Sequence, residues 1–135
     1  FEKERENSLA AFCVMGGIFS EGIDLAGERL IGVLVVGTGL PGICTEREIL
    51  KGWYEKQGKD GFAYAYRYPG MNKVLQAAGL VIRTDTDEGG ILLLDDRFLS
   101  GEYRRLFPRE WADFHVINYE KLPLLLEDFW SNGRK

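Results

Sequence analysis

Short, unbroken apolar runs constrain the fold of this chain more than any other feature of its sequence. "LIGVLVVG" at 30–37 is rich in β-branched residues, and "ILLLDD" at 91–96 is a second run of this kind. "LAAFCVMGG" at 9–17 and "FHVIN" at 114–118 are two further candidates. Such runs predict strands that are buried on both faces. Because predicted helices separate them, we expect an α/β fold with a mostly parallel sheet and helices on both faces.

Helical signals lie between and after these runs. Thr45-Glu-Arg-Glu48 has the pattern of a capping box, in which Thr45 is the N-cap and Glu48 reaches back to it. "FAYAYRYPGMNKVLQAAGLVIR" has helical periodicity, with a break or kink expected at Pro69. We find no internal repeat or linker, so we expect one α/β unit. The expected helices cover about residues 45–57, 62–83 and 121–130.

Length and charge limit the kind of domain and its partners. A chain of 135 residues is long enough to bury one core. Its formal net charge is −4 and its pI is about 5.1, so it lacks the basic face of an autonomous nucleic-acid binder. We therefore expect any contact with DNA or RNA to be local, or to be shared with a partner domain.

Cysteine usage and hydropathy indicate the compartment. Cys13 and Cys44 are far apart in the sequence and are interpreted as reduced thiols. With one histidine, His115, they have no metal-ligand spacing, so no metal site is predicted in this chain. The apolar runs are shorter than the roughly 20 residues of a membrane-spanning helix, and no signal-peptide pattern is found. We expect no membrane association and a reducing, cytoplasmic location.

A glycine-rich loop follows the apolar run at 30–37. Gly37-Thr-Gly39-Leu-Pro-Gly42 matches G-x-G-x-x-G, the pattern of a dinucleotide-binding turn. However, Pro41 and the next three residues push the predicted helix start beyond the third glycine, away from a bound pyrophosphate. The segment directly after that helix is itself predicted to be helical, so it is not a strand ending in Asp or Glu that could hold a ribose. A glycine-rich loop at the carboxyl end of a strand is therefore the favoured interpretation.

A second loop, "GGIFSEGID" at 16–24, directly follows the apolar run at 9–17. Its glycines bracket Ser20, Glu21 and Asp24. Loops at the carboxyl ends of parallel strands are where α/β folds bind ligands. Each of these residues alone is compatible with a solvated turn, but together they favour a functional loop.

The stretch "QAAGLVIR" at 76–83 places Gln76 and Arg83 seven residues apart in an otherwise apolar segment. Seven residues make two helical turns, so both side chains should emerge on one face of the predicted helix. One interpretation is a solvated helix face. The other is an arginine finger, in which Arg83 offsets charge on a phosphate held by another domain and Gln76 orients water or binds the phosphate.

Taken together, "GGIFSEGID", "QAAGLVIR" and "LLLDDRF" at 92–98 resemble the second helicase domain of the DinG/XPD-like superfamily 2 DNA helicases. The resemblance runs from about Phe12 to Trp130. It implies a RecA-like fold of the P-loop NTPase type, truncated at its N-terminal side. It also implies that residues 1–135 are the C-terminal domain, and a piece, of an ATP-dependent helicase that moves 5′ to 3′ on single-stranded DNA.

The resemblance also assigns roles to residues. The 16–24 loop is similar to motif V, and the 76–83 stretch is similar to motif VI, Q-x-x-G-R-x-x-R. By that match Gln76 and Arg83 are catalytic and face the γ-phosphate. The other implied positions are nucleotide-binding Gly22, Asp24 and Gly79, and Ser20 and Glu21 toward DNA or the coupling path.

The expected cofactor is ATP with Mg²⁺, bound mainly by a first helicase domain. This chain has no G-x-x-x-x-G-K-S/T and no D-E-x-H, which the nucleotide site of that first domain would carry. The implied partners are therefore single-stranded DNA and the N-terminal helicase domain of the same protein. On its own the chain is expected not to hydrolyse ATP.

One position departs from the pattern of motif VI. Residue 80 is leucine where the family pattern carries its first arginine. Either the ATPase is attenuated or inactive, or the position was altered. The alternative function is a helicase-derived domain that acts as a nucleic-acid or protein interaction module. The intact Ser20-Glu-Gly-Ile-Asp24 and Arg83 favour the motor domain.

Overall fold

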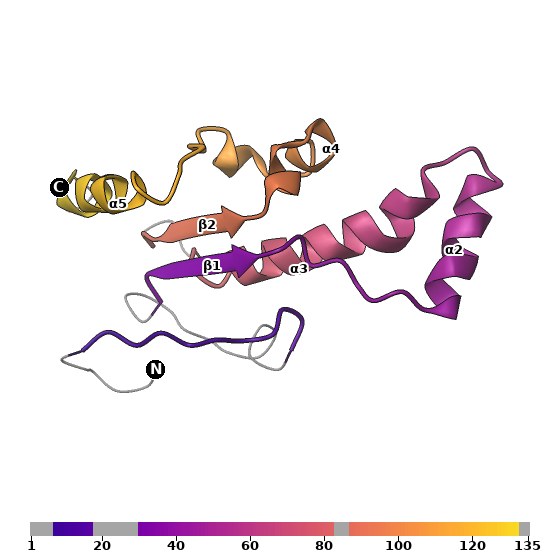
Figure 1. Cartoon of the computed structure of the whole chain (residues 1–135), viewed down its shortest axis with the longest axis horizontal. Coiled ribbons are helices and arrows are strands. Elements are labelled where there is room, and N and C mark those ends of the chain that lie inside the picture. Colours follow the sequence, from indigo (N-terminus) through magenta and orange to yellow (C-terminus); the bar gives the residue numbers. More distant parts are fainter. Residues whose placement is uncertain (1–6, 18–29, 83–86, 133–135) are drawn as a thin grey trace.

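The computed structural model describes residues 7–17, 30–82 and 87–132. The strands and helices of this part of the chain alternate along it (Figure 1). In chain order they are β1 (Gly32–Val36), α2 (Thr45–Glu55), the π-helix η2 (Ala63–Arg67), α3 (Tyr68–Ala78), β2 (Gly90–Leu94), the 3₁₀ helix η3 (Asp96–Leu99), α4 (Gly101–Arg104), the 3₁₀ helix η4 (Arg109–Trp111) and α5 (Leu122–Asn132).

Within the described residues, the sheet consists of two parallel strands. Gly32 of β1 is paired with Gly90 of β2, and Val36 is paired with Leu94. The chain crosses from one strand to the other through α2, η2 and α3, as parallel neighbours require. The prediction of an α/β fold with parallel strands is confirmed for these two apolar runs.

Two predicted strands, 11–16 and 114–118, do not form. The first segment is drawn as a coil in Figure 1 and ends in a turn, in which the N–H of Gly17 donates to the carbonyl of Val14 at 2.9 Å. Phe12 is fully exposed, and Val116 is 62% exposed. A strand needs a neighbouring backbone to receive its hydrogen bonds, and neither segment pairs with one in the described part of the chain.

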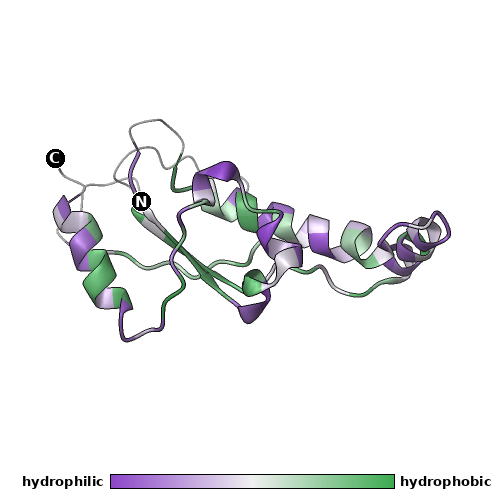
Figure 2. Cartoon of the chain, turned by 90° about the horizontal axis from the view of Figure 1, so that it is seen from above, coloured by the Kyte–Doolittle hydropathy of each residue, from purple (hydrophilic) through white to green (hydrophobic). Residues whose placement is uncertain are grey.

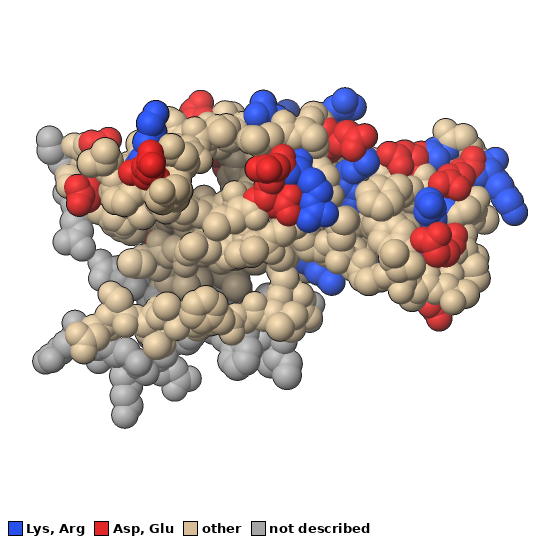
Figure 3. Space-filling view, in the orientation of Figure 1, with Lys and Arg blue, Asp and Glu red and all other residues tan. Residues whose placement is uncertain are grey.

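The core lies on one face of the sheet, under α3. Val35 of β1 packs in a buried cluster with residues of α3, η3 and α4. On the opposite face Leu34 and Val36 remain 63% and 73% exposed, so described residues cover only one of the two faces predicted to carry helices. Figure 2 shows the strands as hydrophobic along most of their length, and Figure 3 shows charged side chains gathered over α4 and α2. The other buried members of the cluster are Met71, Val74, Ala77, Phe98 and Tyr103.

Helix α2 forms where it was predicted, but without the capping box. Cys44 is its N-cap residue, and no side chain caps its first turn. The Glu48 carboxylate instead accepts a hydrogen bond from the Tyr66 hydroxyl at 2.5 Å, which ties α2 to η2. This hydrogen bond raises the pKa of Tyr66 to about 12. The capping prediction is wrong because the Glu48 carboxylate binds the Tyr66 hydroxyl of another element and not the backbone N–H at the start of its own helix.

Of the break or kink predicted at Pro69, the break does not occur, because η2 leads directly into α3; the helix instead widens into a π-turn before the proline. The N–H of Tyr68 donates to the carbonyl of Ala63, which is the wider spacing of a π-turn. Pro69 has no N–H to give to the Ala65 carbonyl four residues earlier. Arg47 of α2 supplies the missing donor, with Nη1 at 2.7 Å from that carbonyl oxygen. The wide turn and the arginine together accommodate the proline.

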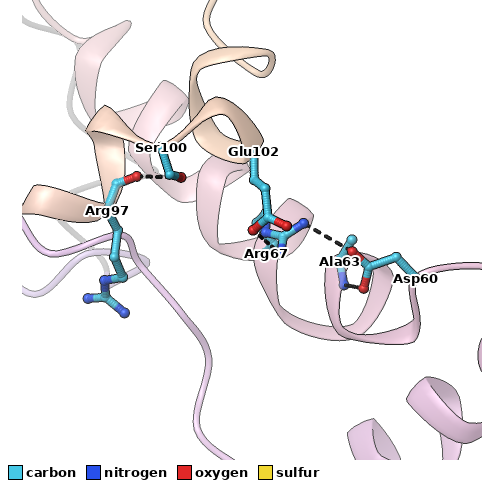
Figure 4. A network of polar contacts seen from close by, with 6 residues as sticks. All are labelled: Asp60, Ala63, Arg67, Arg97, Ser100 and Glu102. Atoms are coloured by element: carbon cyan, nitrogen blue, oxygen red, sulfur yellow. Dashed lines mark hydrogen bonds and ion pairs between the residues drawn. The ribbon is translucent and has the colours of Figure 1, made fainter.

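Asp60 fixes the start of this long helical segment. One carboxylate oxygen accepts the N–H of Ala63 at 2.9 Å, as an N-cap residue does, and the other accepts from Arg67 at 3.1 Å. The hydrogen bond from the Ala63 N–H is the main reason that the pKa of Asp60 is lowered. Arg67 also pairs with Glu102 at 2.6 Å and so joins η2 to α4 (Figure 4).

Candidate nucleotide-binding and coupling site

The predicted site residues divide between the described and the remaining parts of the chain. Gln76 and Gly79 belong to the described part, as does Leu80. The others lie outside the described residues, so their predicted roles stay predictions. These are Ser20, Glu21, Gly22 and Asp24 of the 16–24 loop and Arg83 of the 76–83 stretch.

Helix α3 ends earlier than predicted. Its last residue is Ala78, and Gly79 is its C-cap. The N–H groups of Leu80 and Val81 then bond to carbonyls three residues back, at 3.3 and 3.1 Å, so the chain leaves the helix through tight turns. The prediction that the helix continues beyond Ala78 is therefore wrong for residues 79–82, and Arg83 lies outside the described residues.

Two local causes explain the early end of α3. Glycine is a poor residue for a helix interior, which favours termination at Gly79. Val81 is only 3% exposed and lies against Gly89, where a Cβ atom would overlap Cγ1 of the valine. Burial of Val81 beside the start of β2 thus draws the chain away from the helix axis.

Gln76 projects from the exposed side of α3. Its neighbours Ala77 and Ala78 are buried, whereas Gln76 and Gly79 are exposed and Leu80 is half-buried. No hydrogen-bond partner holds the Gln76 amide among the described residues. An amide offers both donors and an acceptor, so this side chain is free to bind a phosphate oxygen or to orient water.

The 16–24 loop begins close to α3. Gly16 has a φ of +80°, a conformation that favours glycine, and a Cβ atom there would lie 3.2 Å from Cε of Lys73. Lys73 is one turn before Gln76 on α3. The start of the 16–24 loop therefore lies next to α3, the helix that contains the first residues of the 76–83 stretch. Sequence reasoning missed Lys73, and its spacing of three residues from Gln76 was the available signal.

The glycine-rich loop after β1 has a packing role. A Cβ atom on Gly39 would lie 2.6 Å from the carbonyl oxygen of Gly70, and one on Gly70 would lie 2.7 Å from that of Thr38. These glycines let the loop approach α3 closely, and α2 begins only at Thr45. The arrangement agrees with a glycine-rich loop and not with a dinucleotide-binding turn.

The 92–98 stretch, the third part of the family resemblance, makes hydrogen bonds between its own residues. Asp95 follows β2 and accepts two hydrogen bonds from the Arg97 guanidinium, at 2.8 and 2.7 Å. These bonds are the main reason that the pKa of Asp95 is lowered. In the described part of the chain, no group of three or more His, Cys, Asp or Glu side chains could hold a metal ion. No helix there is long and apolar enough to cross a membrane.

A parallel β-α-β unit, with a strand-end loop resting on its crossover helix, defines an α/β domain. Within that class, the helicase C-terminal domain family matches residues 1–114. The chain belongs to this family.

Individual relatives agree with the family match. The chain is 30% identical to the Probable ATP-dependent helicase MJ0942 of Methanocaldococcus jannaschii over 71% of this chain and 16% of that protein. It is 32% identical to the human Regulator of telomere elongation helicase 1 over 85% and 10%, respectively. Identity to the ATP-dependent DNA helicase chl-1 of Caenorhabditis elegans is 34%, over 78% and 13%. The chain thus spans at most about a sixth of these relatives.

Proposed function

We propose that this chain is part of the C-terminal motor domain of an ATP-dependent DNA helicase with a RecA-like fold that moves 5′ to 3′. The observation that carries the proposal is the family match over residues 1–114, which spans both the 16–24 loop and the 76–83 stretch. The relatives are named as helicases, two of them ATP-dependent. In this proposal the two segments act as motifs V and VI of a composite ATP site.

The described geometry supports a shared site. Gly16 begins the first segment and lies against Lys73, one turn from the exposed Gln76. A lysine ammonium and a side-chain amide both suit phosphate oxygens, whereas the metal would be held by another domain. The bound ATP with Mg²⁺ supplies the phosphoryl group, and the N-terminal domain of the same protein holds most of it.

The proposed roles follow the chemistry of each side chain. Gln76 hydrogen-bonds the γ-phosphate or its attacking water, and Arg83 offsets the charge that spreads over the phosphoryl oxygens. Ser20 and Glu21 lie on the path to single-stranded DNA. The nucleotide cleft is completed by Gly22, Asp24 and Gly79.

Leu80 favours a second candidate, a catalytically attenuated domain that serves as a nucleic-acid or protein interaction module. The half-buried leucine cannot donate a hydrogen bond where the family pattern carries an arginine. Arg83 would then be the remaining guanidinium of motif VI.

Restoring the arginine separates the two candidates. An arginine finger is worth about 10³–10⁵ in rate, so Leu80→Arg in the full-length protein should raise DNA-stimulated ATP hydrolysis by about 10³ or more. Arg83→Ala should abolish the activity that is left. Leu80→Met, which changes shape but not charge, should leave the rate unchanged. Steady-state phosphate release measures all three variants.

A different result would favour the interaction module. If neither Leu80→Arg nor Arg83→Ala alters phosphate release, this segment does not act on the nucleotide. Leu80 is half-buried in the turn after α3, so urea unfolding of wild type and Leu80→Arg is the control that separates a change in rate from a change in folding.

A further inference from the structure

A run of aromatic rings, of which Trp53 is the most exposed and Tyr54 is half-buried, lies on the lobe formed by α2, η2 and the start of α3. We call Trp53, Tyr54, Tyr64 and Tyr68 the aromatic ladder. The rings of Trp53 and Tyr54 meet edge to face with centroids 4.9 Å apart. Tyr54 and Tyr64 are stacked at 4.1 Å, and the Tyr64 and Tyr68 rings meet edge to face at 5.1 Å. Each ring therefore supports the next.

Hydrogen bonds hold together α2 and η2, which carry most of the aromatic ladder, and the last ring of the ladder is exposed. No residue of α2 is buried, and the helix projects from the sheet on its connecting loops (Figure 1). The hydrogen bonds of Glu48 and Arg47 nevertheless fix α2 to η2. Trp53 ends the ladder and is 55% exposed. A large exposed ring on a helix that is fixed in this way can receive a planar group with a smaller loss of conformational entropy than a ring on a free segment.

Two lysines without ion pairs flank these rings. Nζ of Lys59 lies 5.5 and 5.6 Å from the ring centroids of Tyr54 and Tyr64. Lys56, three residues after Trp53, is exposed, and neither lysine forms an ion pair with a described residue. Figure 3 shows side chains of both signs on this lobe.

Two of the nearby carboxylates have partners of their own, whereas Glu46 and Glu55 form no ion pair with a described residue. Glu48 binds Tyr66 and lies 3.9 Å from Lys51, and Asp60 binds the Ala63 N–H and Arg67. Of the positively charged side chains on the lobe, Lys56 and Lys59 are thus the ones available to an anion beside the rings.

We propose that the aromatic ladder is a stacking site for single-stranded DNA. A base stacks on Trp53, and the adjoining phosphates contact Lys56 and Lys59. Exposed aromatic rings beside lysines are the chemistry that binds single strands without sequence preference. The chain has a net charge of −4, so stacking has to supply affinity that phosphate contacts alone would not. This inference rests on the proposed DNA helicase function and adds a second contact to it.

The stacking step can be tested with bases removed from the DNA. Full-length protein is titrated, by fluorescence anisotropy, into labelled oligothymidylate and into an abasic oligonucleotide of equal length and charge. Trp53→Ala should weaken oligothymidylate binding about ten-fold and leave abasic binding unchanged. Trp53→Phe should retain most of the affinity. Ile49→Ala, an exposed apolar residue one turn earlier, is the matched control and should change neither.

The phosphate contacts have their own readout. Lys56→Gln and Lys59→Gln should each reduce the salt dependence of log K by about 0.7, for both oligonucleotides. Equal binding by Trp53→Ala and wild type, or an equal loss on both oligonucleotides, would overturn the stacking site. If wild type then still shows DNA-stimulated ATPase activity, the proposed function stands. Wild-type protein that binds neither oligonucleotide and has no such activity would remove both.

Discussion

Both ends of α3 bury apolar residues, but they differ in whether their polar side chains have partners. At the N-terminal end, Arg67 pairs with Asp60 and Glu102, Gly70 touches the loop after β1, and Met71 is buried. At the C-terminal end, Gln76 is exposed and has no partner among the described residues.

This difference teaches where stability and function are separated in the helix. The N-terminal end uses its polar groups on neighbouring elements, so its orientation relative to the sheet is fixed. The C-terminal end leaves an amide unsatisfied by protein, which costs little at an exposed position and keeps it available to a ligand. We therefore expect substitutions at the N-terminal end to change stability, and Gln76→Ala to change it by less than about 0.5 kcal/mol.

The largest effect is expected where α3 and the loop meet. Gly70→Ala should destabilise the chain by about 3 kcal/mol, because the new Cβ atom would meet the Thr38 carbonyl oxygen at 2.7 Å and neither backbone can yield. Urea unfolding followed by circular dichroism measures the change. Gly52→Ala is the matched control, since its Cβ atom meets nothing within 4 Å, and it should stabilise α2 by about 0.5–1 kcal/mol. Equal effects of the two substitutions would contradict the close approach.

A smaller effect is expected at Arg47. Arg47→Met should cost about 2 kcal/mol, because it leaves the Ala65 carbonyl without its charged donor. Arg109→Met, at an exposed site, should cost less than about 0.5 kcal/mol.

A double-mutant cycle, measured by the same urea unfolding, sharpens the test of Arg47. Pro69→Ala restores an N–H that can reach the Ala65 carbonyl, so it should offset most of the loss in Arg47→Met. Additive effects of the two substitutions would mean that the arginine does not replace the proline's missing donor.

A third and smaller effect, with a pH dependence, is expected at the N-cap. Asp60→Ala should cost about 1 kcal/mol at pH 7. The pKa of Asp60 is lowered in the folded chain, so its contribution is present above its ordinary value of about 3.9 and is lost as pH falls through the folded value. The difference between wild type and variant in urea unfolding should therefore shrink below about pH 4. A difference that stays constant from pH 7 to pH 3 would show that the ionised carboxylate is not responsible.

Local pattern predicted the elements that local and short-range forces determine. The runs at 30–37 and 91–96 form β1 and β2, and α2 and α5 lie close to their predicted bounds. The run at 9–17 has a similar composition but forms no strand, because a strand also needs a partner that composition does not reveal. The Glu48 capping box failed for a similar reason, since Tyr66 is a donor from another element.

The site was predicted less completely. Motif spacing predicted roles for Gln76 and Gly79, and these roles stay predictions. Both residues are exposed at the end of α3, which stops at Ala78. Burial of Val81 is a tertiary effect that helical periodicity cannot register. The N-cap at Asp60 followed a visible Asp-Gly pattern that sequence reasoning passed over. The bond from Arg47 links residues eighteen apart, and Pro69 was its only sequence signal.

The wide turn of η2 also affects how positions are counted along the helix. A π-turn holds one residue more than an α-turn, and each residue of an α-helix advances the side-chain direction by about 100°. The extra residue therefore rotates everything after it, including Gln76, relative to the residues before it. A one-residue deletion between 63 and 67 would turn the amide to a different side of the helix, together with the buried Met71 and Val74 of α3. The length of this turn, as much as its composition, determines where Gln76 points.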